Sequence, residues 1–234
     1  MGLAPSLLWE SDKVYDLDID LPPLTEQRAI AGVLSSLDDK IALLHRRNKP
    51  LQTLAETLFR QWFVEEATDD WKEVFLRDVA NLNVSTITSS YANKQILYLD
   101  TSSLTSGTFG DVQSLAIEEA PSRAKRLVKH NDILISTVRP DQRHYGIIKA
   151  PAENLVVSSG FCLVTATQVD SHFLYSLLTG DEMTEFLHSI AEGSTSTYPS
   201  LKSSDLAALK IRKPPKARHD EFAKIANASY WQIE

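Results

Sequence analysis

The chain has little of what disulfide-bonded, membrane-spanning or exported proteins need. Its 234 residues include a single cysteine, Cys162, so no disulfide can form within the chain. The apolar neighbours of Cys162 predict a buried strand thiol, with a reactive thiol as the minor alternative. No run of about 18 apolar residues is present, and residues 1–12 lack the basic start and apolar stretch of a signal peptide. We therefore expect a cytoplasmic protein.

The sequence also lacks the residue patterns that usually carry catalysis. Gly107 and Gly110 stand alone in a turn rather than in a phosphate-binding loop. No cysteine and histidine pairs have metal-binding spacing, and Ser158-Ser159-Gly160 lacks the strand-to-helix elbow of a hydrolase. Neither a compact acid–acid–lysine cluster of the nuclease kind nor the Asn/Asp-Pro-Pro-aromatic motif of adenine methyltransferases is found. We expect a non-catalytic protein with no cofactor of its own.

The net charge of −7 argues at first against a nucleic-acid partner. The charge is unevenly distributed, however, because residues 1–70 hold 7 basic and 13 acidic side chains. Residues 71–213 hold 14 basic and 15 acidic side chains, so that part of the chain is nearly neutral. Because phosphate contacts depend on the local field rather than on the total charge, DNA binding by this part stays open.

A stretch near the start of the chain returns near its end. At a fixed offset of 192 and without gaps, residues 11–41 align with residues 203–233. Pro22-Pro23 falls on Pro214-Pro215, and apolar positions match on both sides of the prolines. A long-period repeat means that one supersecondary unit is used twice. The repeated unit predicts a short strand, a Pro-Pro stop and an amphipathic helix, so the chain holds one full period and the opening of the next.

A long helix is predicted after the first Pro-Pro pair. Thr25 is the expected N-cap, and Glu26 adds favourable charge to the first turn. Pro50 removes a backbone hydrogen bond, so we expect a kink or a short break between about Arg47 and Leu51. Apolar side chains at spacings of three and four form a coiled-coil-like seam, which either contacts a partner helix or packs on the chain's own domain. The seam residues are Ile30, Leu34, Leu37, Ile41, Leu44, Leu51, Leu58 and Trp62.

The segment after this helix mixes strand and helix patterns and predicts an α+β fold with a twisted, largely antiparallel sheet. Strands are expected at residues 71–79 (with a turn), 95–101, 132–138 paired with 146–149, 155–165 with a bulge at Gly160, and 206–211. One or two helices are expected at residues 172–190, a polar loop at 192–205 and a second amphipathic helix from near Arg218.

Two basic clusters and one hydroxyl-rich loop are the candidate DNA contacts. Arginine and glutamine side chains can read base edges, and hydroxyl groups can bind phosphates or bases. The alternative for both basic clusters is an ordinary solvated surface. The candidate residues are Arg123, Lys125 and Arg126 in the first cluster, Arg139, Gln142, Arg143 and His144 in the second, and Thr195, Ser196, Tyr198 and Lys202 in and after the loop.

Several stretches together resemble one known family. LPPLTEQRAIAGVLSSLDDKI (21–41), followed by NKPLQTLAETLFRQWF (48–63), resembles the conserved region of specificity (S) subunits of type I restriction–modification enzymes. HNDILISTVRP (130–140) and EGSTSTYPSLKSSDLAALKIRKPP (192–215) are similar to stretches of their target recognition domains.

This resemblance implies a division of the chain. S subunits consist of two recognition domains separated by two long antiparallel helices, related by internal pseudo-twofold symmetry. The implied segments are a remnant of a first recognition domain (1–21), a conserved long helix (22–64), a linker (65–70), a target recognition domain (71–213) and the start of a second conserved helix (214–234). The chain is then expected to be a fragment or a half-subunit.

The resemblance also implies partners. We expect double-stranded DNA, methyltransferase (M) subunits, a restriction (R) subunit reached through the complex, and self-association through the conserved helix. S-adenosylmethionine, ATP and magnesium are expected only on the partner subunits, in a bacterial or archaeal cytoplasm. Two alternatives remain, namely the recognition portion of a fused methyltransferase–nuclease and a coiled-coil scaffold that binds no DNA.

Overall fold

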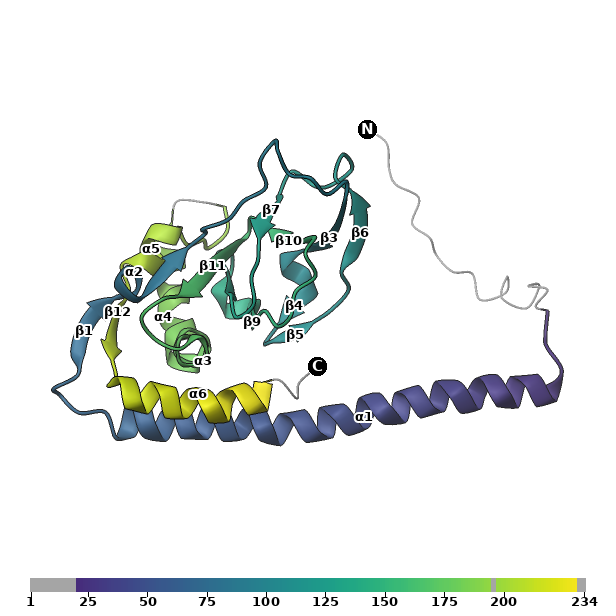
Figure 1. The fold of residues 1–234 in the computed structure, drawn as a ribbon, viewed down its shortest axis with the longest axis horizontal. Coiled ribbons are helices and arrows are strands. Elements are labelled where there is room, and N and C mark those ends of the chain that lie inside the picture. The colour runs from purple at the N-terminus through teal and green to yellow at the C-terminus, as the bar shows by residue number, and fades with distance from the viewer. Residues whose placement is uncertain (1–19, 195–196, 231–234) are drawn as a thin grey trace. The chain divides into compact units, whose positions relative to one another are not determined.

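The computed structural model describes residues 20–194 and 197–230 and begins with a long helix (Figure 1). Helix α1 (Leu24–Arg60) starts directly after Pro23, one residue before the predicted N-cap, so Thr25 does not cap it. Glu26 lies in the first turn, as predicted. The helix is continuous through Pro50, so the predicted break does not occur, and it ends in a π-helical turn, η2 (Gln61–Glu65). The strand predicted around residues 11–20 falls almost wholly outside the described residues.

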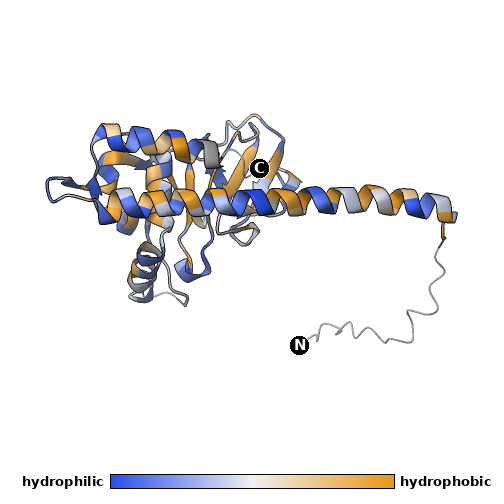
Figure 2. Cartoon of the chain, turned by 90° about the horizontal axis from the view of Figure 1, so that it is seen from below, coloured by the Kyte–Doolittle hydropathy of each residue, from blue (hydrophilic) through white to orange (hydrophobic). Residues whose placement is uncertain are grey.

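The second copy of the Pro-Pro unit forms a helix at the matching position. Helix α6 (Lys216–Tyr230) begins 192 residues after Leu24, which is the offset of the sequence repeat (216 − 24 = 192). It lies beside the part of α1 that follows Asn48 and runs antiparallel to it (Figures 1 and 2). The repeat therefore predicted where both helices begin.

Most strands form two four-stranded sheets, and the mixed, mostly antiparallel arrangement predicted from the sequence is confirmed. The first sheet has the order β6-β3-β10-β7, in which only β10 and β3 are parallel, and the second has the order β2-β11-β8-β9. Their bounds are β2 Ala80–Leu82, β3 Gln95–Leu99, β6 Gln113–Ala116, β7 Ala124–Leu127, β8 Ile133–Ser136, β9 Tyr145–Ile147, β10 Leu155–Ser158 and β11 Phe161–Ala166.

Two small ribbons complete the strands. Strand β1 (Lys72–Phe75) pairs with β12 (Lys210–Lys213), and a hairpin joins β4 (Leu104–Thr105) to β5 (Thr108–Phe109). The predicted strand at 206–211 starts too early, because Leu206 lies in the short helix α5 (Ser203–Ala207).

The predicted strand at 155–165 is in fact two strands in different sheets. Strand β10 belongs to the first sheet, β11 belongs to the second, and the chain turns between them at Ser159-Gly160. A Cβ atom added at Gly160 would lie 2.9 Å from the Thr101 side chain, so the corner has no room for one. The register irregularity in this stretch falls between Val157 and Ser158, not at Gly160.

Apolar side chains form the core in layers. One cluster, which includes Leu99, Leu134 and Phe161, fills the space between the two sheets. A larger cluster lies on the other face of β8 and β11, under the helices α3 (Ser171–Thr179), α4 (Asp181–Glu192) and α6. Cys162 is fully buried there, and burial raises the pKa of its thiol, so the reactive-thiol alternative is disfavoured.

An aromatic cluster joins α6 to the end of α1. Phe222 is fully buried, with its ring centroid 5.2 Å from that of Phe63, 5.9 Å from Phe59 and 6.5 Å from Trp62. The Arg218 guanidinium lies 5.4 Å from the Trp62 ring. Aromatic pairs at these separations contribute about 0.5–1.5 kcal/mol each beyond their burial. The cluster therefore fixes α6 on the last two turns of α1.

The first half of α1 shows a different surface. Leu34, Leu37 and Ile41 are 56 %, 54 % and 52 % exposed, and Ile30 is 47 % exposed. Figure 2 shows apolar residues recurring along this half between hydrophilic ones. Further along the seam, Leu44, Leu51, Leu58 and Trp62 are half-buried. The described residues thus leave an apolar stripe on α1 that is about three helical turns long.

Candidate nucleic-acid interface

Backbone hydrogen bonds join segments that are far apart in sequence along one edge of the two sheets. The amide of Ser159, at the β10–β11 corner, donates to the carbonyl of Arg123 at 2.7 Å. The amide of Thr137, after β8, donates to the carbonyl of Gly160 at 2.8 Å. The first basic cluster is therefore next to the segment that leads into the second.

The hydroxyl-rich loop reaches the same edge. Leu201 donates to the Thr137 carbonyl at 2.7 Å, and Arg139 donates to the Pro199 carbonyl at 2.9 Å. We call this surface the loop edge, and it consists of residues 123–126, 137–144, 158–160 and 197–203. Two of the predicted contacts in the loop, Thr195 and Ser196, lie outside the described residues.

Unusual backbone angles shape the loop between β8 and β9. Arg139 and Arg143 have φ of 48° and 56° and flank the 3₁₀ turn η4 (Pro140–Gln142). Non-glycine residues in the left-handed region cost about 1–3 kcal/mol each and persist only where their surroundings hold them. Strain of this kind concentrates at binding sites, so this loop is a candidate for one.

Arg139 stacks on an exposed aromatic ring. Its guanidinium lies 4.4 Å from the centroid of the Tyr198 ring, and Tyr198 is 54 % exposed. Stacking holds the planar guanidinium in one orientation, so less side-chain entropy is lost when it forms further hydrogen bonds. Gln142 is exposed on the same turn. The turn therefore presents the N–H donors of the Arg139 guanidinium in one orientation, together with the side-chain amide of Gln142.

Arg143 has a different role from Arg139 in the free protein. Its Nη1 lies 2.6 Å from Oδ1 of Asp181 at the start of α4, and the hydrogen bond to Asp181 raises the pKa of the guanidinium. On the same loop Asp141 lies 3.2 Å from Nδ1 of His188, also on α4. The Arg143–Asp181 ion pair and the Asp141–His188 contact hold the loop against α4, so Arg143 positions the turn on which Arg139 and Gln142 lie.

His144 anchors a hairpin. Its Nδ1 lies 2.6 Å from the carbonyl oxygen of Leu104, which places the proton on Nδ1 and ties the β4–β5 hairpin to the loop. The ring is half-buried in this contact.

The first cluster is divided between exposed and half-buried side chains. Arg123 and Lys125 are exposed, as is Lys202 on the neighbouring segment. Arg126 is half-buried, and its Nε is buried without a hydrogen-bond partner among the described residues. The exposed ammonium groups are suited to phosphates, whereas the guanidinium of Arg126 lies within the surface layer.

Asn83 is a site residue that the sequence analysis missed. Its Oδ1 accepts from the Leu163 amide at 3.0 Å, and its Nδ2 donates to Oγ of Ser203 at 2.7 Å. This side chain therefore ties β11 to the segment that carries Tyr198 and Lys202. The residue type is the sequence signal that could have marked this position. Asparagine adopts the left-handed region more readily than other non-glycine residues, and Asn83 has a φ of 54°.

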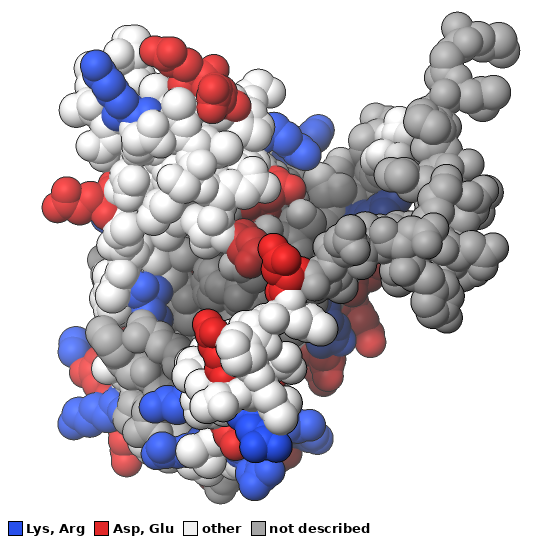
Figure 3. Space-filling view, turned by 90° about the vertical axis from the view of Figure 1, so that its right-hand side faces the viewer, with Lys and Arg blue, Asp and Glu red and all other residues white. Residues whose placement is uncertain are grey.

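Charge is mixed on one further face of the molecule. On the face drawn in Figure 3, basic and acidic side chains are interspersed and a broad area is uncharged. Among residues 20–194 and 197–230, no group of three or more histidine, cysteine or acidic side chains could hold a metal ion. Within the same described ranges, no helix combines the length and apolar character needed to cross a bilayer.

Comparison with known proteins places the chain in a family. The model of the family described as "Type I restriction modification DNA specificity domain" matches residues 68–228. The type I restriction enzyme HindI specificity subunit of Haemophilus influenzae is 28 % identical over 158 residues, which are 67 % of this chain and 34 % of that protein. The MjaVIII specificity subunit of Methanocaldococcus jannaschii is 24 % identical over 226 residues, covering 86 % of this chain and 53 % of that protein. The chain thus spans about a third to about half of the length of these relatives.

Solved structures show the same fold. The HsdS subunit from Thermoanaerobacter tengcongensis matches with a TM-score of 0.57 at 22 % identity, over 69 % of this chain and 42 % of that one. The S subunit of a type I restriction-modification system from M. genitalium matches with a TM-score of 0.56 at 15 % identity, over 90 % of this chain and 55 % of that one. The long helix followed by a mixed domain is therefore an arrangement that these structures share.

Proposed function

The chain belongs to the family of type I restriction modification DNA specificity domains, and from that premise we propose that it reads DNA sequence without catalysing a reaction. The observation that carries this proposal is the loop edge, where Arg139 is stacked on Tyr198 beside the exposed Gln142. Arginine and glutamine can each bond a base edge in the major groove with two hydrogen bonds. Lys125 and Lys202, exposed on neighbouring segments, are suited to backbone phosphates.

We infer further that this single domain reads one half of a bipartite target. The division into a helix (22–64), a linker (65–70) and a recognition domain (71–213) belongs to this proposal. Residues 1–21 are then a remnant of a first recognition domain, and residues 214–234 are the start of a second conserved helix. Methyltransferase subunits then dock on the helices, a restriction subunit joins through them, and S-adenosylmethionine, ATP and magnesium bind to those partners. A cytoplasmic location in a bacterial or archaeal cell accords with this function.

Duplex binding as a function of salt tests the proposal. The chain should retard a duplex that carries its target at low ionic strength, and log Kd should change linearly with log salt. A specific site should bind about 10³-fold or more tightly than random duplex of the same length. Methylome sequencing of a host that carries the complete locus supplies the target. A chain that binds no duplex at any salt concentration would favour the coiled-coil scaffold instead.

The repeat also supports self-association. In the second copy Phe222 and Ala226 are fully buried in the core cluster that includes residues at the end of α1. Subtracting the offset of 192 gives Ile30 and Leu34, which are exposed in the first copy. The stripe on α1 is therefore equivalent to a face that is already packed elsewhere in the same chain. The stripe on α1 therefore fits an equivalent helix end. That helix end comes from a second molecule of this chain or from the other half of a longer parent protein.

A glutamate on the stripe should prevent this association. We expect wild type to form a dimer at micromolar concentration and Leu34→Glu to be monomeric, because the charge would be buried on pairing. The melting temperature of the monomer should be unchanged, since Leu34 is 56 % exposed within it. Light scattering over a concentration series measures the mass. Ser35→Glu places the same charge on the neighbouring exposed position, off the seam, and should still dimerise; a wild-type monomer at all concentrations would contradict self-association.

A further inference from the structure

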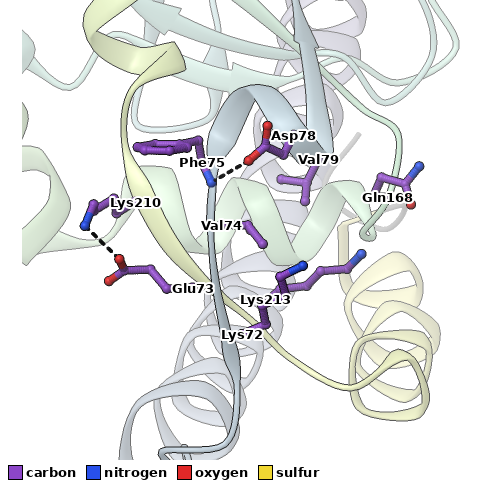
Figure 4. A pocket seen from close by; sticks show the side chains of 9 residues that line it. All are labelled: Lys72, Glu73, Val74, Phe75, Asp78, Val79, Gln168, Lys210 and Lys213. Atoms are coloured by element: carbon purple, nitrogen blue, oxygen red, sulfur yellow. Dashed lines mark hydrogen bonds and ion pairs between the residues drawn. The ribbon is translucent and has the colours of Figure 1, made fainter.

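A lysine-lined hollow of about 470 Å³ lies beside the ribbon formed by β1 and β12, away from the residues of the loop edge (Figure 4). Lys72 and Lys213 come from opposite strands and extend toward the same side of the ribbon as Gln168. The half-buried Val74 supplies apolar surface near them, and the core residue Val79 lies beneath the hollow. We call this feature the lysine hollow.

The two lysines face each other across the ribbon. Lys72 and Lys213 are direct cross-strand partners in the antiparallel register. Like charges directly opposite one another destabilise a sheet. Neighbouring basic residues on β12 have acidic partners, because Lys210 lies 2.8 Å from Glu73 and Arg212 lies 3.7 Å from Asp69. Within the described residues, neither Lys72 nor Lys213 forms an ion pair, so an anion placed between them would relieve their repulsion.

The surroundings of the hollow determine which anion fits. The nine residues 65–73 include five carboxylates, at Glu65, Glu66, Asp69, Asp70 and Glu73. Four of these carboxylates have basic partners within the chain. Glu73 and Asp78 line the hollow itself, so it can admit one carboxylate between the lysines but not the continuous row of charges on duplex DNA, which carries about one per 1.7 Å of its axis. A single carboxylate on a peptide can instead reach between the two lysines. The apolar surface of the half-buried Val74 also matches a peptide side chain better than it matches a phosphodiester.

We propose that the lysine hollow binds an acidic segment of a partner protein. One carboxylate of that segment lies between Lys72 and Lys213, and a neighbouring apolar side chain covers Val74. This contact goes beyond the reading of DNA and does not depend on it. It is also distinct from the helix seam, so it gives the chain a second protein-binding surface at the base of the recognition domain.

Titration of the full chain with short peptides tests the site directly. N-acetyl-Glu-Leu-Glu-amide should shift the NMR signals of Val74, Val79 and Gln168 in a saturable manner. N-acetyl-Gln-Leu-Gln-amide and inorganic phosphate should leave the same signals in place at equal concentration. Equal shifts with the neutral peptide or with phosphate, or no shift with the acidic peptide, would overturn the proposal.

Variants then assign the binding to the two lysines. Lys72→Ala with Lys213→Ala should weaken binding of the acidic peptide at least tenfold. Lys94→Ala with Lys224→Ala removes two exposed lysines elsewhere and should leave the affinity unchanged. The slope of log Kd for duplex DNA against log salt should be the same in both double variants. A slope lower by about two in the Lys72 and Lys213 variant would assign the hollow to backbone phosphates and refute an acidic segment.

Discussion

Phe222→Ala should lower the free energy of unfolding by about 3–5 kcal/mol, the range for truncating a fully buried phenylalanine. Phe222 has no exposed surface and contacts three aromatic rings at the end of α1. Truncation would leave a cavity that neither rigid helix can close, so α6 should separate from the core first. Chemical denaturation, monitored by circular dichroism, measures the loss in the free energy of unfolding.

The matched control is a phenylalanine on a helix surface. Phe186 on α4 is 52 % exposed, and Phe186→Ala should change the free energy of unfolding by no more than about 0.5 kcal/mol. If the two variants unfold at the same denaturant concentration as wild type, α6 is not held by the aromatic cluster. The interpretation of the exposed stripe on α1 as the equivalent of a packed face on α6 would then lose its support.

Arg139→Ala should weaken binding to the target duplex by about 1–3 kcal/mol, or roughly 5-fold to 150-fold, while binding to random duplex changes little. The stacked guanidinium is held in one orientation by Tyr198, so its removal deletes a preorganised base contact rather than a diffuse charge. Competition of target and random duplex in a fluorescence anisotropy assay separates the two effects.

A second stacked arginine provides the control for this variant. The Arg77 guanidinium lies 4.1 Å from the centroid of the Phe75 ring, on a helix that is not part of the loop edge. Arg77→Ala removes the same charge and the same kind of stack, and it should leave the preference for the target intact. Equal loss of target preference in both variants would mean that Arg139 acts through net charge and reads no base.

Local patterns predicted the helices well and the sheet connections less well. The Pro-Pro pairs mark the starts of α1 and α6 because proline ends a strand and is tolerated at the start of a helix. Pro50 was expected to interrupt α1, but the helix is continuous there, and Pro50 is exposed. The run at 155–165 looked like one strand because both of its halves are apolar, and a single glycine does not reveal that they belong to different sheets.

The loop edge illustrates what one sequence cannot supply. The basic residues at 123–126 and 139–143 could be identified from their type, but their proximity depends on hydrogen bonds between segments tens of residues apart. The roles within the second cluster were also hidden. Arg139 and Arg143 look equivalent in the sequence, yet one stacks on Tyr198 and the other pairs with Asp181. Such a division is a property of the tertiary structure, because both partners come from other parts of the chain.

The β1–β12 ribbon brings the two ends of residues 72–213 together. Lys72 and Lys213 are opposite one another, and opposed Cα atoms in an antiparallel pair are about 4.5–5.5 Å apart. The polypeptide therefore leaves α1 and returns to α6 at nearly the same point. The two helices nevertheless depend on this insert, because the ring centroid of Phe63 lies 4.8 Å from that of Phe173 on α3, and Phe222 of α6 is buried in the same cluster. Removing the insert and joining its ends with a short turn should expose these rings, so a replacement domain would have to bring its own apolar surface to cover them.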